Sequence, residues 1–150
     1  MKLQVPTLDT MDLNINRDDI IYTAALVDGE GSVLLDRSRA SENRYPAVTI
    51  PSTTYAFMKF LKTTFGGTVS RKRVYKKTHK KSWAWSVRGN AALELLKRLI
   101  AFMKEPEKVR RARLLLMRYK VVTAPNGKYT PALLKARRQF ERKFFNKYAR

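Results

Sequence analysis

Two acidic residues alternate with glycine in the segment Asp28-Gly29-Glu30-Gly31, directly after a short apolar run. The rest of the chain is strongly basic, with 32 Lys and Arg residues against 12 Asp and Glu residues and a formal net charge of +20. Carboxylate and carbonyl oxygens are the ligands that hard divalent cations prefer, and substrate phosphates often share those cations. The segment therefore predicts a divalent metal ion held against a phosphate.

The composition limits the class of protein. A length of 150 residues fits one domain, and 44% hydrophobic residues are enough for a core. The large positive charge points to nucleic acid as the first partner and to an anionic membrane surface as the second. No apolar run approaches the ~20 residues of a membrane span, and the polar N-terminus is unlike a secretory signal. Because cysteine is absent, disulfides and thiolate metal sites are excluded; this does not fix the compartment, although an intracellular protein fits best. No membrane partner is expected.

The elements that must position the acids follow from the residue pattern. Asn16 is typical of a helix cap, and Asp18 and Asp19 in the next turn complement the helix dipole. This helix is predicted to run to about Asp28, where the glycines end it. Further strands are predicted over 32–37, 45–50, 68–77 and 82–88, and further helices over 54–65 and from about residues 90, 105 and 130.

This element order, α-β-β-α-β-β-α, predicts an α+β fold with a curved four-stranded antiparallel sheet. Helices are expected on one face, and the other face is left free for a ligand. We interpret 1–150 as one domain with an N-terminal arm over 1–15 and a basic C-terminal helix over 128–150. Asn90 is expected to cap its helix. Helical spacing also predicts a buried side made of Tyr55, Phe57, Met58, Leu61 and Phe65, and another made of Leu133, Leu134, Phe140, Phe144 and Tyr148.

The positive charge is concentrated on the predicted sheet. Between Asn43 and Leu93 there are eleven basic residues and no acidic one. In the fourth strand Trp83, Trp85 and Val87 alternate with polar residues, so the tryptophans are expected under the helices. A basic two-stranded ribbon fits the major groove of DNA. Double-stranded DNA is therefore expected to contact Arg37, Arg39, Arg44, Arg71, Lys72, Arg73, Lys76, Lys77, Lys80, Lys81 and Arg88.

The type of each contact stays open, because lysine and arginine can bind guanine or phosphate. His79, in the turn between the third and fourth strands, is interpreted as a DNA contact or an exposed residue rather than a general base. The basic residues of the last helix are either phosphate contacts or a solvated surface; they are Lys135, Arg137, Arg138, Arg142, Lys143 and Lys147.

The nine residues Thr23-Ala24-Ala25-Leu26-Val27-Asp28-Gly29-Glu30-Gly31 resemble the motif of the LAGLIDADG homing endonucleases. Alanine stands at the third motif position, where the family has glycine, and Glu30 replaces an aspartate while keeping the carboxylate. A looser resemblance in element order covers residues 17–120. Since the motif occurs once, the resemblance implies the single-motif type, which is intron-encoded and acts as a homodimer.

In that family two motif helices pack against each other, and small residues permit the close approach. The resemblance therefore implies that Asp28 either caps a helix end or bridges the dimer. It implies a dimer interface that includes Tyr22, Ala25, Leu26, Asp28 and Gly29.

The resemblance also implies the chemistry. Glu30 and the backbone carbonyl of Gly29 would bind Mg²⁺, with Mn²⁺ as a substitute and no small-molecule cofactor. Lys108 would stabilise the phosphate or poise a water molecule. Ser52 is the best match for the residue that positions the water, although Thr53 or Thr49 could serve.

The resemblance thus implies a site-specific endonuclease that cleaves a long pseudo-palindromic duplex by metal-dependent phosphodiester hydrolysis. The expected setting is the cytoplasm of a prokaryote or an organelle. Two alternatives stay open: a non-cleaving RNA maturase or DNA-binding regulator of the same fold, and a structural basic protein such as a ribosomal component.

Overall fold

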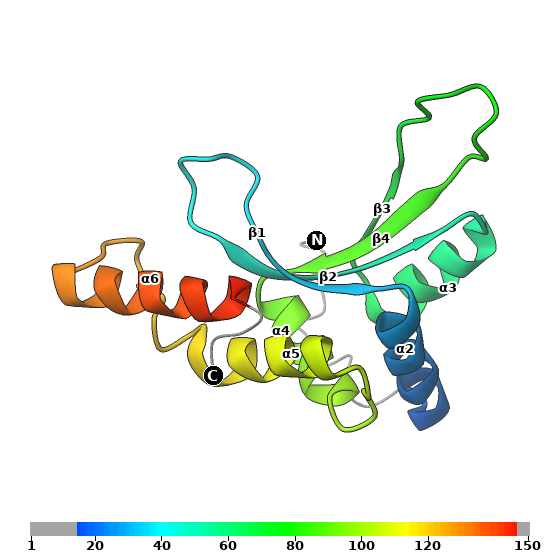
Figure 1. Cartoon of the computed structure of the whole chain (residues 1–150). Coiled ribbons are helices and arrows are strands. Elements are labelled where there is room, and N and C mark those ends of the chain that lie inside the picture. Colours follow the sequence, from blue (N-terminus) through cyan, green and yellow to red (C-terminus); the bar gives the residue numbers. More distant parts are fainter. Residues whose placement is uncertain (1–14, 147–150) are drawn as a thin grey trace, which may run out of the picture.

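A four-stranded antiparallel sheet forms the centre of the fold, with the helices gathered on one side of it (Figure 1). This computed structural model describes residues 15–146. The strands are β1 (Ser32–Asp36), β2 (Tyr45–Ser52), β3 (Thr68–Arg71) and β4 (Trp83–Arg88), in the spatial order β1-β2-β4-β3. The helices are α2 (Arg17–Gly29), α3 (Tyr55–Phe65), α4 (Asn90–Leu99), α5 (Pro106–Arg118) and α6 (Pro131–Phe145). The predicted fold class is confirmed.

The two faces of the sheet differ as the alternation in β4 predicts. Trp85 and Val87 are buried beneath the helices, whereas Ser86 and Arg88 point to the opposite side. The Trp85 indole N–H donates to the carbonyl of Gly66 at 2.8 Å, which satisfies its polar group within the core. We call the side away from the helices the free face; it is lined by Ser32, Tyr45, Thr49, Ser86 and Arg88.

Two long loops rise from opposite ends of the free face (Figure 1). One is the β1–β2 loop over residues 37–44, and the other is the β3–β4 loop over residues 72–82. The helices occupy the other side, so a ligand can approach the sheet between the loops. In residues 15–146 no helix is long and apolar enough to cross a membrane.

The predicted helix starts are mostly confirmed. The Asn16 side chain accepts from the backbone N–H of Asp18, and Thr130 caps α6 through the N–H of Leu133. Asn90 is different, because it is the first residue of α4 and the cap position is Gly89 at φ +64°. That left-handed conformation favours glycine, so the backbone requirement at this turn replaces a side-chain cap.

Two other predictions were wrong in detail. Strand β3 ends at Arg71 instead of residue 77, because residues 72–81 are all exposed and have no apolar side to bury against the helices. The last backbone hydrogen bond between β3 and β4 runs from the Lys72 N–H to the Ser82 carbonyl, at 2.8 Å. Tyr55, expected in the core, is 56% exposed, while Met58 and Leu61 of the same helix are buried. Tyr148 and most of the predicted N-terminal arm lie outside the described residues.

Candidate functional site

The motif segment forms the C-terminal half of α2 and the turn into β1, where the chain reaches the sheet (Figure 1). Gly31 makes this turn possible. A Cβ atom at Gly31 would lie 2.7 Å from the Cα of Val27 and 3.0 Å from the carbonyl oxygen of Thr49. Both neighbours are backbone atoms, so only glycine lets β1 start this close to α2 and β2. The same turn leaves Glu30 exposed at the end of α2.

The carbonyl groups at the end of α2 have different partners. The carbonyl of Leu26 accepts from the N–H groups of Glu30 and Gly31, at 2.9 and 3.0 Å. The Lys108 Nζ donates to the carbonyls of Val27 and Asp28, at 2.8 and 2.6 Å. These bonds satisfy oxygens that a helix end leaves without intrahelical partners.

Two oxygen groups at this helix end stay available. The Gly29 carbonyl accepts no hydrogen bond from any described residue, and the Glu30 carboxylate has no ion pair within residues 15–146. The C-terminal end of a helix carries partial negative charge and therefore attracts cations. A carboxylate, a carbonyl and a helix C-terminus together form a donor set for a hard cation. In the described residues of one chain, no group of three His, Cys, Asp or Glu residues could hold a metal.

Asp28 connects the motif helix to the segment ahead of α5. Its Oδ2 accepts from the backbone N–H of Lys104 at 2.5 Å, and its Oδ1 is buried without a partner among the described residues. The chain therefore uses one oxygen of Asp28 inside the protomer, as a cap for backbone ahead of the α5 helix.

Lys108 is placed by the first turn of α5. Glu105 caps this helix by accepting from the N–H groups of Glu107 and Lys108, at 3.3 and 2.7 Å. From there the Lys108 side chain is half-buried and its ammonium group reaches the end of α2. Lys108 thus lies beside the motif, and its ammonium group contacts the carbonyls of Val27 and Asp28, for which no role was predicted.

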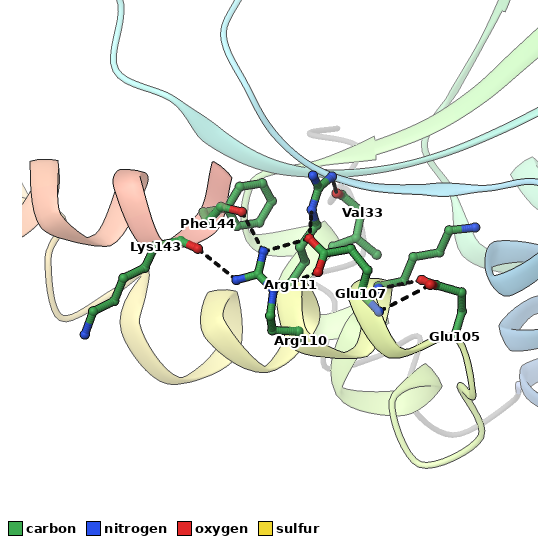
Figure 2. Close-up of polar contacts among 8 residues, drawn as sticks. Val33, Glu105, Glu107, Arg110, Arg111, Lys143 and Phe144 are labelled. Atoms are coloured by element: carbon green, nitrogen blue, oxygen red, sulfur yellow. Dashed lines mark hydrogen bonds and ion pairs between the residues drawn. The ribbon is translucent and has the colours of Figure 1, made fainter. Parts of the chain in front are cut away.

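A cluster of ionic contacts holds α5 in place (Figure 2). Glu107 accepts from Arg110 at 2.7 and 2.8 Å and from Arg111 at 3.1 Å. Arg110 also donates to the carbonyls of Lys143 and Phe144 at the end of α6, both at 2.8 Å. Hydrogen bonds from Arg110, reinforced by the positive charges of both arginines, lower the pKa of Glu107 to about 2. We name Glu107, Arg110 and Arg111 the α5 clamp.

The α5 clamp also touches the sheet. Arg111 Nη1 donates to the carbonyl of Val33 in β1 at 3.3 Å, and its guanidinium lies 5.1 Å from the ring centre of Phe144. Lys108 therefore belongs to a helix whose next turn contacts both α6 and β1.

The three polar residues predicted to position a water molecule are spread along β2. Thr49 is half-buried on the free face, with its backbone next to Gly31. Ser52 stands at the end of β2 and its Oγ accepts from the N–H of Thr54 at 3.0 Å, which starts α3. Thr53 is exposed beside it. The role of each stays a prediction.

The predicted DNA-binding residues lie in several different parts of the structure. Arg37 and Arg39 lie in the β1–β2 loop, where Arg37 donates to the carbonyl of Ala40 at 2.9 Å and Arg39 pairs with Glu42 at 3.8 Å. Arg88 lies on the free face, 5.7 Å from the ring centre of Tyr45. Six further residues, Lys72, Arg73, Lys76, Lys77, Lys80 and Lys81, are exposed in the β3–β4 loop together with His79.

Arg71 and Arg44 depart from this free-face arrangement. Arg71 pairs with Trp83 and alternates with Ser70, so it points to the helix side of the sheet. Arg44 is half-buried directly before β2, donating to the Leu35 carbonyl at 3.3 Å and lying 4.8 Å from the ring centre of Phe145. Contacts of Arg71 and Arg44 with DNA stay predictions. Neither residue lies on the free face or in the β3–β4 loop.

Arg137 is a structural residue rather than a phosphate contact or a solvated side chain. It is 2% exposed, and its guanidinium donates to Thr123 at 2.6 Å, to Glu141 at 3.2 Å and to the carbonyl of Arg44. The guanidinium also lies 5.0 Å from the ring centre of Tyr119. A buried charge needs such partners, and helical spacing alone could not reveal them. Lys135, Arg138, Arg142 and Lys143 of the same helix are exposed.

One side of α2 is only partly covered by the described residues: the Tyr22 ring lies 5.7 Å from that of Phe57, and Leu26 packs against the edge of the core. Ala24 and Val27 are buried against the core, whereas Ala25 and Gly29 are exposed and Tyr22 is 46% exposed. A Cβ atom at Gly29 would meet nothing within 4 Å. We call the side formed by Tyr22, Ala25, Leu26 and Gly29 the α2 face.

Comparison with known proteins identifies the fold. No protein-family model matches the sequence, and no curated protein matches it either. Among solved structures, the homing endonuclease I-CvuI in complex with its target matches with a TM-score of 0.63 and 20% identity, over 89% of this chain and 87% of that chain. The LAGLIDADG homing endonuclease I-GzeII in complex with its DNA target matches with a TM-score of 0.59 and 13% identity, over 87% of this chain and 44% of that one.

This chain has the LAGLIDADG homing endonuclease fold. The archaeal intron-encoded homing endonuclease I-Vdi141I, complexed with DNA, also shares it, with a TM-score of 0.52 and 15% identity over 89% of this chain and 87% of that chain. The resemblance noted in residues 23–31 is therefore confirmed for the fold. In this fold the motif occupies α2, the element whose exposed end carries Glu30.

Proposed function

We propose that this protein is a homodimeric, metal-dependent endonuclease that cleaves a specific site in double-stranded DNA. The observation that carries the proposal is the end of α2, where an unpaired carboxylate and an uncommitted carbonyl stand in a chain of net charge +20. The free face supplies the surface for a duplex, because it is flanked by two long basic loops and opposed by no helix (Figure 1). The similar structures with bound DNA targets support the same assignment.

The α2 face supports the homodimer. A Cβ atom at position 29 would meet no described atom within 4 Å, so packing among the described residues does not require glycine there. A second α2 helix could pack on Ala25 and Gly29, because such small residues let two helix backbones approach closely. A twofold dimer is isologous, so it brings the two Glu30 side chains to the same axis.

The residues at the end of α2 fit a hard divalent cation. Glu30 from each protomer and the Gly29 carbonyl would supply oxygen ligands, and phosphate oxygens would complete the set that Mg²⁺ or Mn²⁺ takes. When bound, such an ion lowers the pKa of an attacking water and neutralises charge on the phosphate.

Lys108 and Ser52 would act beside that ion. An ammonium group has three N–H donors, and Lys108 uses two of them on the carbonyls of Val27 and Asp28. The third can hold a phosphate oxygen or a water molecule. The Ser52 hydroxyl accepts one bond from Thr54 and keeps its own proton to donate to a water. Both side chains are thus fixed by the backbone and retain one free donor each.

A cleavage selection tests the proposal. The purified protein is incubated with a library of randomised duplexes in Mg²⁺ or in EDTA, and its mass is measured by sedimentation with a target duplex and alone. We expect discrete cuts at a near-palindromic site that occur only with the metal. We also expect the protein alone to sediment with twice the 17.4 kDa chain mass. Tight duplex binding without cleavage in any divalent ion would favour the maturase or regulator alternative instead.

A further inference from the structure

A groove lies between α3 and the edge strand β3, with a volume of about 740 Å³. Its lining combines cations with aromatic and apolar side chains: Tyr55, Lys59, Lys62, Val69, Arg71 and Trp83. No function was predicted from the sequence for Lys59 or Lys62.

The groove opens on the helix side of the sheet. Along β3, Val69 and Arg71 alternate with Thr68 and Ser70, and Val69 packs against the core. Successive side chains of a strand point to opposite faces, so Arg71 shares the helix side with Val69. This places the groove around the edge of the sheet from the free face, and a duplex lying on the free face leaves it accessible.

The charge of the groove is uncompensated. The side chains of Lys59, Lys62 and Arg71 make no hydrogen bond or ion pair with any other residue in 15–146. The whole stretch between residues 43 and 93 contains no acidic residue. Lys59 and Lys62 are three positions apart, which puts them on the same side of α3. Three clustered cations without acids suit a polyanion, and a phosphodiester backbone supplies one phosphate per nucleotide.

The aromatic pair Tyr55 and Trp83 indicates which kind of polyanion fits the groove. The Tyr55 ring is more than half exposed and packs against Trp83, with ring centres 5.3 Å apart. Single-strand-binding proteins combine a cationic groove that follows the backbone with aromatic rings on which bases stack. A duplex keeps its bases stacked inside, so it cannot use the Tyr55 ring in this way. An unpaired strand can.

We infer that the α3–β3 groove binds single-stranded nucleic acid, with phosphates on Lys59, Lys62 and Arg71 and a base stacked on Tyr55. This site is separate from the proposed duplex site, and its existence does not depend on cleavage.

Fluorescence anisotropy tests the inference with labelled 12-nucleotide oligo(U) and oligo(dT), each added to full-length protein already saturated with an unlabelled duplex. Both strands are expected to bind in the presence of the duplex. The variant Lys59→Gln/Lys62→Gln should bind at least about 5-fold more weakly, and its salt dependence should fall by about 1.4, for two phosphate contacts at ~0.7 each. The control Lys120→Gln/Lys128→Gln, with the same net charge at exposed positions away from the groove, should bind like wild type.

A second pair of variants tests the stacking. Tyr55→Ala should weaken single-strand binding by about 10-fold, whereas Tyr55→Phe should retain it because the ring is kept. Circular dichroism confirms that each variant is folded, and duplex cleavage by all four should match wild type. Complete displacement of the strands by the duplex, or equal losses in the groove and control variants, would overturn the inference.

Discussion

Glu30 and Glu107 are two acids at helix ends in a strongly basic chain, and they differ in almost every respect. Glu107 lies in the first turn of α5, where the helix dipole favours a carboxylate, and three arginine hydrogen bonds hold it. Glu30 stands at the negative end of α2, is exposed, and has no ion pair within residues 15–146. One placement stabilises the fold. The other is unfavourable for the folded protomer and becomes favourable only when a cation binds.

An excess of cations does not neutralise every acid in this chain. The clamp arginines lie on the same helix as Glu107, three and four residues away, so they reach it with little loss of freedom. The cation nearest to the end of α2 is Lys108, and its ammonium group is committed to backbone carbonyls. Glu30 is thereby kept available for a ligand.

The largest effect is expected from Glu30→Gln. Removing a metal-binding carboxylate should lower the cleavage rate by about 100- to 1000-fold, equivalent to several kcal/mol of transition-state stabilisation. The free energy of unfolding should stay equal or rise by a few tenths of a kcal/mol, because a charge leaves the negative end of a helix. Single-turnover cleavage and urea unfolding measure the two quantities. The exposed loop residue Glu42 provides the control variant Glu42→Gln. If Glu30→Gln cleaves like that control, Glu30 is not the metal ligand.

The two glycines beside Glu30 should respond in different ways. Gly31→Ala places a methyl group against backbone on two sides and should destabilise the protein by about 2 kcal/mol. In Gly29→Ala the added methyl group meets no atom of residues 15–146 within 4 Å, so the isolated protomer should change by no more than a few tenths of a kcal/mol while the dimer weakens. Urea unfolding and sedimentation equilibrium distinguish the two effects. An unchanged dimer constant in Gly29→Ala would remove the α2 face as the interface.

The variant Glu107→Gln is expected to show the reverse profile of Glu30→Gln. Loss of the charge weakens the hydrogen bonds from both arginines, which should cost about 2 kcal/mol of folding stability. Cleavage by the folded fraction should be nearly unchanged, since Glu107 does not contact the end of α2. A loss of cleavage at full occupancy of the folded state would mean that the α5 clamp also positions Lys108 for catalysis.

The sequence could predict the parts of the fold that depend on local pattern. Asn16, Thr130 and the alternation around Trp85 belong to short-range rules, and the structure follows them. The motif with its glycines was sufficient to locate the candidate site at Glu30. Strand β3 was predicted too long because a run of cations was compatible with an exposed ribbon, whereas the chain had no apolar partner to continue the ladder.

Long-range contacts were out of reach of these rules. Lys108 meets carbonyls about eighty residues earlier in the chain, and Arg137 finds the backbone of Arg44 across the fold. Nothing in the spacing of either residue distinguishes it from a solvated cation. The exposure of Tyr55 could not be predicted for the same reason. Its helical spacing matches that of the core residues, and only the packing of α3 on the sheet decides which end of the apolar side is buried.

The smallest effect is a dependence of stability on acid pH that should come from Glu107. Its pKa is about 2 in the folded chain against an ordinary value of 4.5. A lowered pKa means that the stabilisation is fully present above pH 4.5 and is lost as the pH falls from 4.5 towards 2. Because the side chain is 23% exposed, solvent screening should reduce the loss to about 1 kcal/mol between pH 5 and pH 3. Urea unfolding at these two pH values should show a smaller loss in Glu107→Gln than in wild type. The control variant Glu94→Gln removes an exposed ion pair with Lys97 and should lose as much unfolding free energy between pH 5 and pH 3 as wild type. If Glu107→Gln also loses as much as wild type, the α5 clamp does not determine the stability of the fold at acid pH.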